Sequence, residues 1–352
     1  MHSMKLSEFK YDLPKGAIIA QEPANPRDSA KMMVYNKETK KYEHKIFRDI
    51  INYFQKGDCI VVNDTRVFPA RLWGTKEKTN AEIEVMLLRE LRSTEKIWDV
   101  LVEPARKVRI GNKIYFDNSR FYCEVIDNTT SRGRTVRFGL EGDLFEEING
   151  IGFMPLPDYI KRTATEADKE SYQSVFADLS RQPASIAPPT AALHFTPELV
   201  DQLIQKGVKF ATVTVNIGQG IFESIGVEDL TKHSMNSEYF EINLKNAEII
   251  NKSLKTGKRV CAVGASVVRA LESSVLVSGT VKANKGWTDR FVFPPSEFKI
   301  ANMYISNFTP SASPSLLLTA AFLEDNIIPE IMKIAFEKKY RLYAYGDALL
   351  IL

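Results

Sequence analysis

Short apolar runs and polar turns alternate near the start of the chain and predict β structure there. Residues 32–35 and 41–46 lie on either side of a turn-like segment, 36–39, which favours a hairpin. A short helix is expected near residues 47–54, and Gly57 would end it. These elements place the first part of a sheet within the first sixty or so residues.

A continuous apolar run at residues 59–62 follows, and its length is that of a strand buried on both faces. Asn63, Asp64, Thr65 and Arg66 come directly after it. Open α/β sheets usually bind their ligands at the carboxyl ends of such strands. These polar residues are therefore candidates for a binding site.

Between residues 70 and 140 the pattern changes to short strands separated by Gly and Asn, which is typical of a small antiparallel barrel. The predicted strands cover residues 81–88, 97–102, 113–116, 121–126 and 134–138. Basic residues of this region could hold phosphates, although a solvated face explains any single one better. They are Arg106, Lys107, Arg109, Arg132, Arg134 and Arg137.

From residue 208 onward strands and helices alternate, which is the rhythm of a mostly parallel sheet. The predicted elements are strands at 208–215 and 259–263, helices at 247–255, 268–272, 315–322 and 327–338, and a last strand at 340–345. The predicted fold class is therefore mixed, mostly parallel α/β with a small inserted antiparallel β-barrel. We assign residues 1–68 and 153–352 to the main domain and residues 69–152 to the barrel.

The segment 185–199 contains two adjacent prolines, His194 and a helix start. Thr196 is a suitable N-cap, and Pro197 suits the first helical position because no N–H is needed there. His194 should then lie on a rigid loop at the mouth of a helix, where an imidazole can bind a ligand or transfer protons. A histidine that only satisfies the loop explains the pattern equally well.

Composition narrows the class of protein. A chain of 352 residues, 44% hydrophobic and 26% charged, is long enough for two or three globular domains. The formal net charge of +3 permits nucleic-acid binding without indicating it. The three cysteines lie far apart in apolar runs, and the four histidines lack the spacing of a metal site. We therefore expect buried thiols, no metal, no membrane span and a cytoplasmic protein.

Two glycine-containing loops are weaker candidates for ligand binding. Gly218 and Gly220 follow a predicted strand, but the third glycine and the downstream acid of a dinucleotide site are missing. Ser266 lies between a strand and a helix, where backbone N–H groups could face a polar ligand. Asp64 and Asp347 follow predicted strands and could hold hydroxyl groups, although a structural cap or ion pair explains each equally well.

Longer motifs, in order over nearly the whole chain, resemble S-adenosylmethionine:tRNA ribosyltransferase-isomerase, a family of queuosine biosynthesis. The segments are YDLP at 11–14, IAQEP at 19–23, PRDS at 26–29, VNDTRV at 62–67, PAR at 69–71, MPLP at 154–157, YIKR at 159–162, APPTAALHFT at 187–196, GWTD at 286–289 and GDALLIL at 346–352. The family fold implied by this resemblance is a mixed α/β domain with an inserted β-barrel, which agrees with the change of pattern near residue 70.

The resemblance also implies a reaction. The family transfers and isomerises the ribosyl group of S-adenosylmethionine onto 7-aminomethyl-7-deazaguanine at the tRNA wobble position, giving epoxyqueuosine-tRNA with release of adenine and methionine. A base must remove a proton beside the sulfonium, and an acid must help adenine leave. The expected partners are S-adenosylmethionine, as a substrate, and a tRNA with a queuosine-type anticodon. The oligomeric state stays open, with a monomer among the alternatives.

Residue roles follow from the same resemblance. His194, Asp64 and Arg66 are the expected catalytic residues, with His194 as the acid/base group. The residues expected to bind or orient the substrate are Thr65, Thr190, Gly218, Gly220, Ser266, Arg269 and Asp347.

Four positions depart from the residues usual in the family: Asn216, Asn236, Ala265 and Thr309. Histidine is usual at three of them, Asn216, Asn236 and Thr309, and its loss removes groups that titrate near neutral pH. An alternative hypothesis follows. The chain would then be a catalytically inactive or altered-substrate paralogue that still binds tRNA or an adenosyl ligand.

Overall fold

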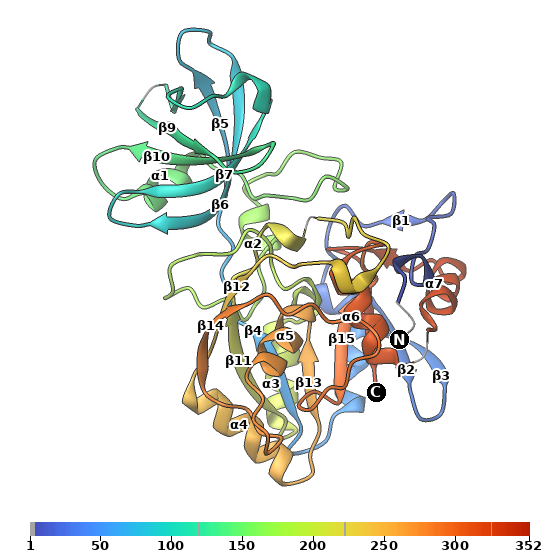
Figure 1. Ribbon diagram of the computed structural model, residues 1–352. Coiled ribbons are helices and arrows are strands. Elements are labelled where there is room, and N and C mark those ends of the chain that lie inside the picture. The colour runs from blue at the N-terminus through green and yellow to red at the C-terminus, as the bar shows by residue number, and fades with distance from the viewer. Residues whose placement is uncertain (1–3, 119, 222, 325) are drawn as a thin grey trace.

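A nine-stranded mixed sheet forms the main body of the protein, and a closed six-stranded barrel projects from it (Figure 1). The computed structural model describes residues 4–118, 120–221, 223–324 and 326–352. From edge to edge the sheet contains β14 (Asn284–Thr288), β12 (Glu238–Ile242), β11 (Lys209–Val215), β4 (Cys59–Asn63), β13 (Val260–Val263), β15 (Met303–Asn307), β17 (Ala348–Ile351), β2 (Lys31–Asn36) and β3 (Lys41–Ile46). Two short strands, β1 (Ile18–Ile19) and β16 (Arg341–Leu342), pair separately in parallel.

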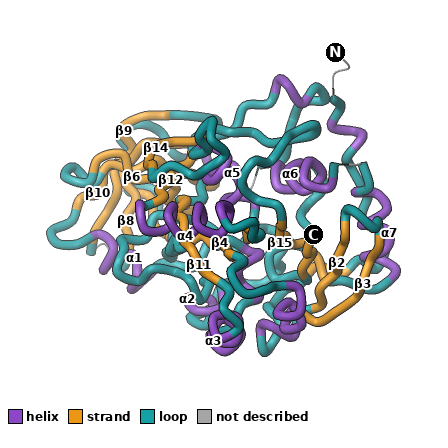
Figure 2. Tube along the Cα trace, turned by 90° about the horizontal axis from the view of Figure 1, so that it is seen from below, coloured by secondary structure: helices purple, strands orange, loops and turns teal. Residues whose placement is uncertain are grey.

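Helices cover both faces of the sheet. In Figure 2, α5 and α6 lie on one side of β4 and β15, and α3 lies on the other. The α-helices are α1 (Leu144–Ile151), α2 (Asp168–Ser171), α3 (Pro197–Gln205), α4 (Leu244–Lys255), α5 (Ala265–Ser273), α6 (Pro314–Leu323) and α7 (Ile328–Glu337). The 3₁₀ helices are Leu6–Glu8, Arg27–Ser29, Phe47–Tyr53, Ala105–Lys107, Thr190–His194, Gln219–Ile221 and Leu230–Lys232. No helix in the described parts of the chain is long and apolar enough to cross a membrane.

The continuous apolar run of β4 is explained by burial on both faces. Cys59 and Val61 pack into the core formed with α4, α5, α6 and α7. Ile60 and Val62 point the opposite way, into the core formed with α3 and the 3₁₀ helices Phe47–Tyr53 and Thr190–His194. A strand enclosed in this way has no polar face to show to solvent, so its sequence does not alternate.

Four adjacent strands, β11, β4, β13 and β15, pair in parallel, and antiparallel strands flank them. The predicted class, a mixed α/β fold with a small antiparallel barrel, is confirmed. Because these strands are parallel, the residues that follow each of them meet at one edge of the sheet. Asn216, Asp64 and Gly264 follow β11, β4 and β13, and Asn307 is the last residue of β15.

The barrel contains one strand more than the sequence predicts. Its hydrogen-bonded order is β10 (Gly133–Gly139), β7 (Ile97–Glu103), β6 (Glu82–Arg92), β5 (Arg71–Lys76), β8 (Lys113–Phe116) and β9 (Phe121–Asn128). The missed strand is β5, whose interior Gly74 weakens the strand pattern. That glycine faces the barrel core, where a Cβ atom would lie 2.6 Å from the Ile114 side chain.

The chain enters and leaves the barrel at neighbouring points. Arg71 and Phe153 form an isolated antiparallel bridge. Gly152 passes so close to Pro69 that a Cβ atom would overlap its carbonyl oxygen. The assignment of residues 69–152 to a separate domain stays a prediction.

Other local predictions had mixed outcomes. The hairpin of β2 and β3 is confirmed, and Thr196 caps α3 through a hydrogen bond from the Leu199 amide. The last strand, expected at 340–345, is confirmed only over Arg341–Leu342 (β16), because Tyr343 has a left-handed backbone with φ of 74° and the chain turns there; the strand at Ala348–Ile351 was not predicted. Arg134 cannot serve a basic RNA-binding face, because it is buried and donates to backbone carbonyls such as that of Val108.

Candidate active site

A cavity of 470 Å³ lies between the barrel and the carboxyl end of β15, and its volume is that of a small-molecule site. Arg71, Glu84, Glu103 and Arg132 line it from the barrel. These four residues form two ion pairs, with 3.1 Å between Arg71 Nε and Glu84 Oε1 and 3.2 Å between Arg132 Nε and Glu103 Oε2. The main body contributes residues that include Tyr159, Thr190, Asn307, Thr309 and Tyr343.

A second cavity, of 70 Å³, adjoins the first and shares Thr190 and Ser315 with it. It lies at the first turns of α5 and α6, which meet there. Gly264, with φ of 88°, is the N-cap of α5 and has no side chain to cap the helix. The positive end of the α5 dipole therefore faces this small cavity.

Four of the seven residues predicted to bind substrate line this same small cavity: Thr190, Gly220, Ser266 and Arg269. Arg269 is buried, and its Nη1 forms an ion pair with Glu238, which also lines the cavity. The rest of the guanidinium donates to the backbone carbonyls of Arg290 and Thr288, at 2.9 and 3.1 Å. Together these three contacts hold the charged side chain in one place.

The segment after β4 lies behind the cavities. Asp64 is buried and accepts a hydrogen bond of 2.6 Å from Thr214 Oγ1. Burial raises the pKa of the Asp64 carboxyl above its ordinary value, although that hydrogen bond opposes the change. Thr65 Oγ1 lies 2.6 Å from Ser185 Oγ, and Arg66 Nη1 donates to the Leu179 carbonyl at 3.4 Å.

Asn63, one of the binding-site candidates that the sequence places after the apolar run, connects this segment to the small cavity. Its Oδ1 accepts from the backbone amides of Thr65 and Val215, at 3.1 and 2.9 Å. Its Nδ2 donates to the Val215 carbonyl at 3.0 Å and to Ser266 Oγ at 3.3 Å. A fully buried amide thus fixes the ends of β4 and β11 and reaches a residue of the cavity wall.

His194 is also buried behind the cavity wall, and its ring lies 4.9 Å from the ring of Phe47. Its Nε2 is 2.8 Å from Asn307 Oδ1. Since Asn307 Nδ2 donates to the carbonyls of Tyr343 and Ala344, its Oδ1 is the acceptor and His194 Nε2–H is the donor. Burial lowers the pKa of His194 to about 4, although the Asn307 contact opposes this change. The imidazole is therefore neutral at neutral pH.

Comparisons with known proteins identify the family. A family model described as "Queuosine biosynthesis protein" matches residues 6–351. The chain belongs to this family. The S-adenosylmethionine:tRNA ribosyltransferase-isomerase of Cytophaga hutchinsonii is 52% identical over 352 residues, covering 99% of this chain and 100% of that protein. Its counterpart in Chloroherpeton thalassium is 49% identical over 351 residues, with coverage of 99% and 100%.

A solved structure agrees over the same length. The crystal structure of S-adenosylmethionine tRNA ribosyltransferase from Thermotoga maritima matches with a TM-score of 0.54 and 31% identity, covering 98% of this chain and 100% of that one. The family inferred from the motifs is thus confirmed, and with it the enzyme class, an S-adenosylmethionine-using tRNA-modifying transferase of queuosine biosynthesis. Of the two hypotheses drawn from the sequence, these comparisons support the active transferase and not the inactive paralogue.

The positions at which this family member departs from the usual motifs surround the cavities. Thr309 lines the large cavity, and its buried Oγ1 has no hydrogen-bond partner among the described residues. Ala265 lines the small cavity. Asn216 lines a neighbouring groove, together with Gly218, and accepts from Thr65 Oγ1 at 3.3 Å. Asn236 Nδ2 donates to Glu223, a residue of the large cavity, at 3.3 Å.

Asp347, expected to orient the substrate, is instead engaged with the protein itself. It is 1% exposed and lies outside the walls described for the cavities. Its carboxylate accepts from the backbone amides of Arg341 and Lys31, at 2.7 and 3.1 Å, and from the Arg341 guanidinium at 3.0 Å. These contacts fix the turn before β17 against the start of β2.

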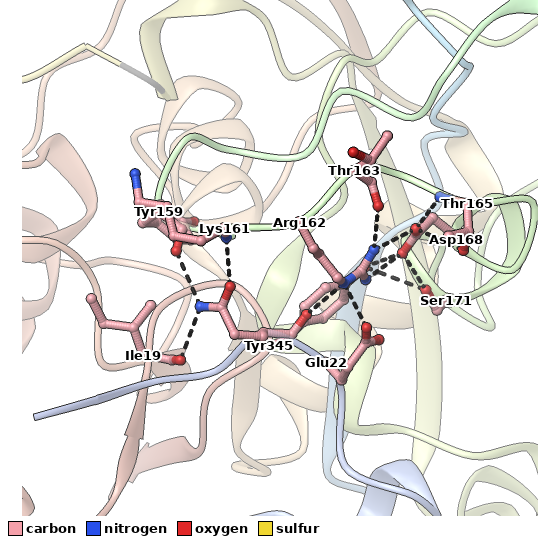
Figure 3. Close-up of polar contacts among 11 residues, drawn as sticks. Ile19, Glu22, Tyr159, Lys161, Arg162, Thr163, Thr165, Asp168, Ser171 and Tyr345 are labelled. Atoms are coloured by element: carbon pink, nitrogen blue, oxygen red, sulfur yellow. Dashed lines mark hydrogen bonds and ion pairs between the residues drawn. The ribbon is translucent and has the colours of Figure 1, made fainter.

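A polar network missed by the sequence supports one wall of the large cavity. Figure 3 shows Arg162 between Glu22 and Asp168. Its two terminal nitrogens each lie 2.7 Å from an oxygen of Asp168, and its Nε lies 2.5 Å from Glu22. Burial alone would raise the pKa of Asp168, but the hydrogen bonds from Arg162 and Thr165 hold it at about 2. The network ties the family motif at 159–162 to the motif at 19–23.

Among the described residues, no group of three or more His, Cys, Asp or Glu side chains is placed to hold a metal ion. The three cysteines are buried and free, as expected. Burial raises the pKa of the Cys59 thiol to about 12, so it is protonated at neutral pH. The expectation of a reaction without metal stays a prediction.

Proposed function

We propose that the chain forms epoxyqueuosine by moving the ribosyl group of S-adenosylmethionine onto 7-aminomethyl-7-deazaguanine at the tRNA wobble position, and that it does so in the two adjoining cavities. The observation that carries this proposal is their location. They lie at the carboxyl end of the parallel strands, where α/β proteins bind ligands, and the barrel closes the other side of the large cavity.

The small cavity suits the methionine end of S-adenosylmethionine. A carboxylate there would meet the positive end of the α5 dipole and the guanidinium of Arg269. The ammonium group would meet the Glu238 carboxylate. Thr190, which lines both cavities, would lie beside the sulfonium and the ribose.

The large cavity suits the adenosyl group and the incoming base. Tyr159 and Tyr343 line it, and their ring centres lie 4.8 Å apart at 60°. One tyrosine ring can therefore pack on a purine while the other tyrosine fixes the orientation of that ring. The unpartnered Thr309 hydroxyl is available to a ribose hydroxyl or a base edge.

His194 acts in this proposal as a positioning residue and not as the acid/base group. Its hydrogen bond fixes Asn307, and Asn307 in turn holds the backbone of Tyr343 and Ala344 at the cavity wall. Asp64, Thr65 and Arg66 similarly support the segments beneath the cavities. Asp64 and Arg66 stay predicted as catalytic residues only on the strength of the sequence motif.

The experiment that tests the function uses the purified protein, S-adenosylmethionine and a tRNA that carries 7-aminomethyl-7-deazaguanine. Mass spectrometry of the digested tRNA should show epoxyqueuosine, and free adenine should appear in equal amount. Binding of both substrates without product would contradict the proposal and favour the inactive paralogue. Adenine release without epoxyqueuosine would point to a different acceptor.

A further inference from the structure

A groove of 360 Å³ separates β6 of the barrel from the β12–β14 edge of the sheet. The proposed reaction does not use it. Its walls include Arg89 and Trp98 from the barrel, and Gln182, Asn216, Tyr239 and Trp287 from the main body. The groove combines aromatic rings, a guanidinium and amides.

The most exposed aromatic ring in this groove is Trp287, at 56%. It projects from β14, the edge strand, and belongs to the GWTD motif at 286–289. Tyr239 is its cross-strand partner, and the two ring centres are 5.9 Å apart at 75°. The edge-to-face contact with Tyr239 therefore holds the indole in place, while Trp287 remains exposed to a ligand.

Arg89 reaches across the groove to the same ring. Its Cζ lies 5.5 Å from the Trp287 ring centre, and its Nη2 lies 3.1 Å from Asp99 Oδ2. A guanidinium beside an exposed indole is the arrangement that receives a nucleobase, because both groups are flat and both attract a π system. Lys285, exposed and two residues before Trp287 on the same strand, adds positive charge for a phosphate.

The groove also contains a hydrogen-bond donor that lacks a partner among the described residues. Trp98 lines it and is 2% exposed, yet its indole Nε1–H finds no acceptor among the described residues. Gln182 and Asn216 place amides along the same wall. A buried donor without a partner is costly, and the edge of a bound base would supply the missing acceptor. A purely apolar protein partner would not supply this acceptor.

The groove is next to the proposed reaction site. Leu88 lines both the groove and the large cavity, and Glu238 lines both the groove and the small cavity. A nucleotide in the groove would therefore be a near neighbour of a base that enters the large cavity. We propose that this groove binds an unpaired base of the tRNA anticodon loop that flanks the wobble nucleotide, stacked on Trp287 and Arg89. This inference rests on the proposed function for the identity of the RNA.

The test uses an anticodon stem-loop RNA that carries 7-aminomethyl-7-deazaguanine, and versions in which each flanking loop base is replaced in turn by an abasic residue. For Trp287→Leu we expect the KM for this RNA to rise on the order of tenfold, since stacking on one aromatic ring is worth about that much. The KM for S-adenosylmethionine should not change. Trp287→Phe should retain most of the RNA affinity because it keeps a flat ring.

One of the abasic RNAs should have a KM with the unaltered protein that is raised by a similar factor. With Trp287→Leu the same RNA should show no further rise in KM, because both changes remove the same contact. Trp73→Leu is the matched control: Trp73 is 46% exposed on the barrel, outside the groove, and its loss should leave RNA binding unchanged. Equal RNA affinity of the unaltered protein and Trp287→Leu would overturn the proposal. So would additive effects with every abasic RNA.

Fluorescence polarisation of the labelled stem-loop RNA separates this inference from the proposed function. If the unaltered protein binds the RNA but releases no adenine, the proposed function fails and the Trp287 variants still decide the groove. If adenine and epoxyqueuosine form but Trp287→Leu binds the RNA as well as the unaltered protein does, the groove proposal alone is refuted.

Discussion

His194 Nε2 lies 2.8 Å from Asn307 Oδ1, and this hydrogen bond joins a buried imidazole to the wall of the large cavity. Asn307 Nδ2 donates to the carbonyls of Tyr343 and Ala344. In the proposed function, the histidine therefore acts on the site through another side chain. This distinction between positioning and proton transfer leads to two measurable differences.

The first difference is in the pH profile. His194→Ala leaves the Asn307 carboxamide oxygen without its donor, so we expect kcat to fall about tenfold with no change in the pH dependence of kcat between pH 6 and 9. His194→Gln, which can still donate, should recover part of the rate. Loss of an ionisation near pH 6 to 7 in a folded His194 variant would instead identify His194 as an acid/base group.

The second difference is in stability. An unfolded chain binds a proton at His194 below its ordinary pKa of 6.5, whereas the folded chain resists protonation until the pKa of about 4. This residue's contribution is therefore present at neutral pH, and roughly 3 kcal/mol of the free energy of unfolding is lost as the pH falls from 6.5 to 4. Urea unfolding at pH 7.5 and 4.5 should show a smaller pH effect in His194→Gln. Identical pH effects would mean that the imidazole is not held neutral.

Arg162 makes a paired contact with the buried carboxylate of Asp168. Arg162→Ala leaves a buried carboxylate without its cation, so we expect a loss of about 3 kcal/mol in the free energy of unfolding at pH 7. Because the pKa of Asp168 is lowered to about 2, this contribution exists above pH 4 and disappears as the pH falls towards 2.

Adding Asp168→Asn to Arg162→Ala provides the control, because it removes the stranded charge. The double variant should be more stable than Arg162→Ala at pH 7. If urea unfolding shows the reverse order, the ion pair is not the reason for the loss.

Thr190 lines both cavities, as Ser315 does. Thr190→Val keeps the shape but removes one hydrogen bond, so the KM for S-adenosylmethionine should rise on the order of fivefold to tenfold while the KM for tRNA stays constant. Thr75→Val, on the exposed outer face of β5, is the matched control and should change neither constant. A rise in the KM for tRNA alone would mean that Thr190 contacts the RNA and not S-adenosylmethionine.

Arg269 and Glu238 form the buried ion pair of the small cavity. Arg269→Lys keeps the charge but loses the fixed planar geometry, so S-adenosylmethionine should bind at least tenfold more weakly while methylthioadenosine, which lacks the methionine carboxylate and ammonium, should bind as before. Calorimetric titration with both ligands measures the difference. Equal weakening for both ligands would exclude recognition of the methionine end.

Local features of the fold were predictable from the sequence. The Thr196 cap, the buried run of β4 and the hairpin of β2 and β3 each depend on neighbours within a few residues. The strand β5 was missed because Gly74 has no side chain to show the alternation. The strand expected at 340–345 is shorter than predicted, because the left-handed turn at Tyr343 requires tertiary contacts that override its β preference.

The site was only partly predictable for the same reason. Thr190, Gly220, Ser266 and Arg269 come together because parallel strands bring their carboxyl ends to one edge, a rule that the sequence pattern can invoke. The direction in which His194 points depends on Asn307, 113 positions away, and no local pattern carries that information.

A crystal structure of the protein with S-adenosylmethionine bound would show whether the two cavities form the reaction site. We expect density that spans both cavities, with the methionine carboxylate at the start of α5 beside Arg269, the sulfonium next to Thr190, and the adenine against Tyr159 or Tyr343. Density for S-adenosylmethionine in the groove beside Trp287, or elsewhere with both cavities empty, would contradict this expectation.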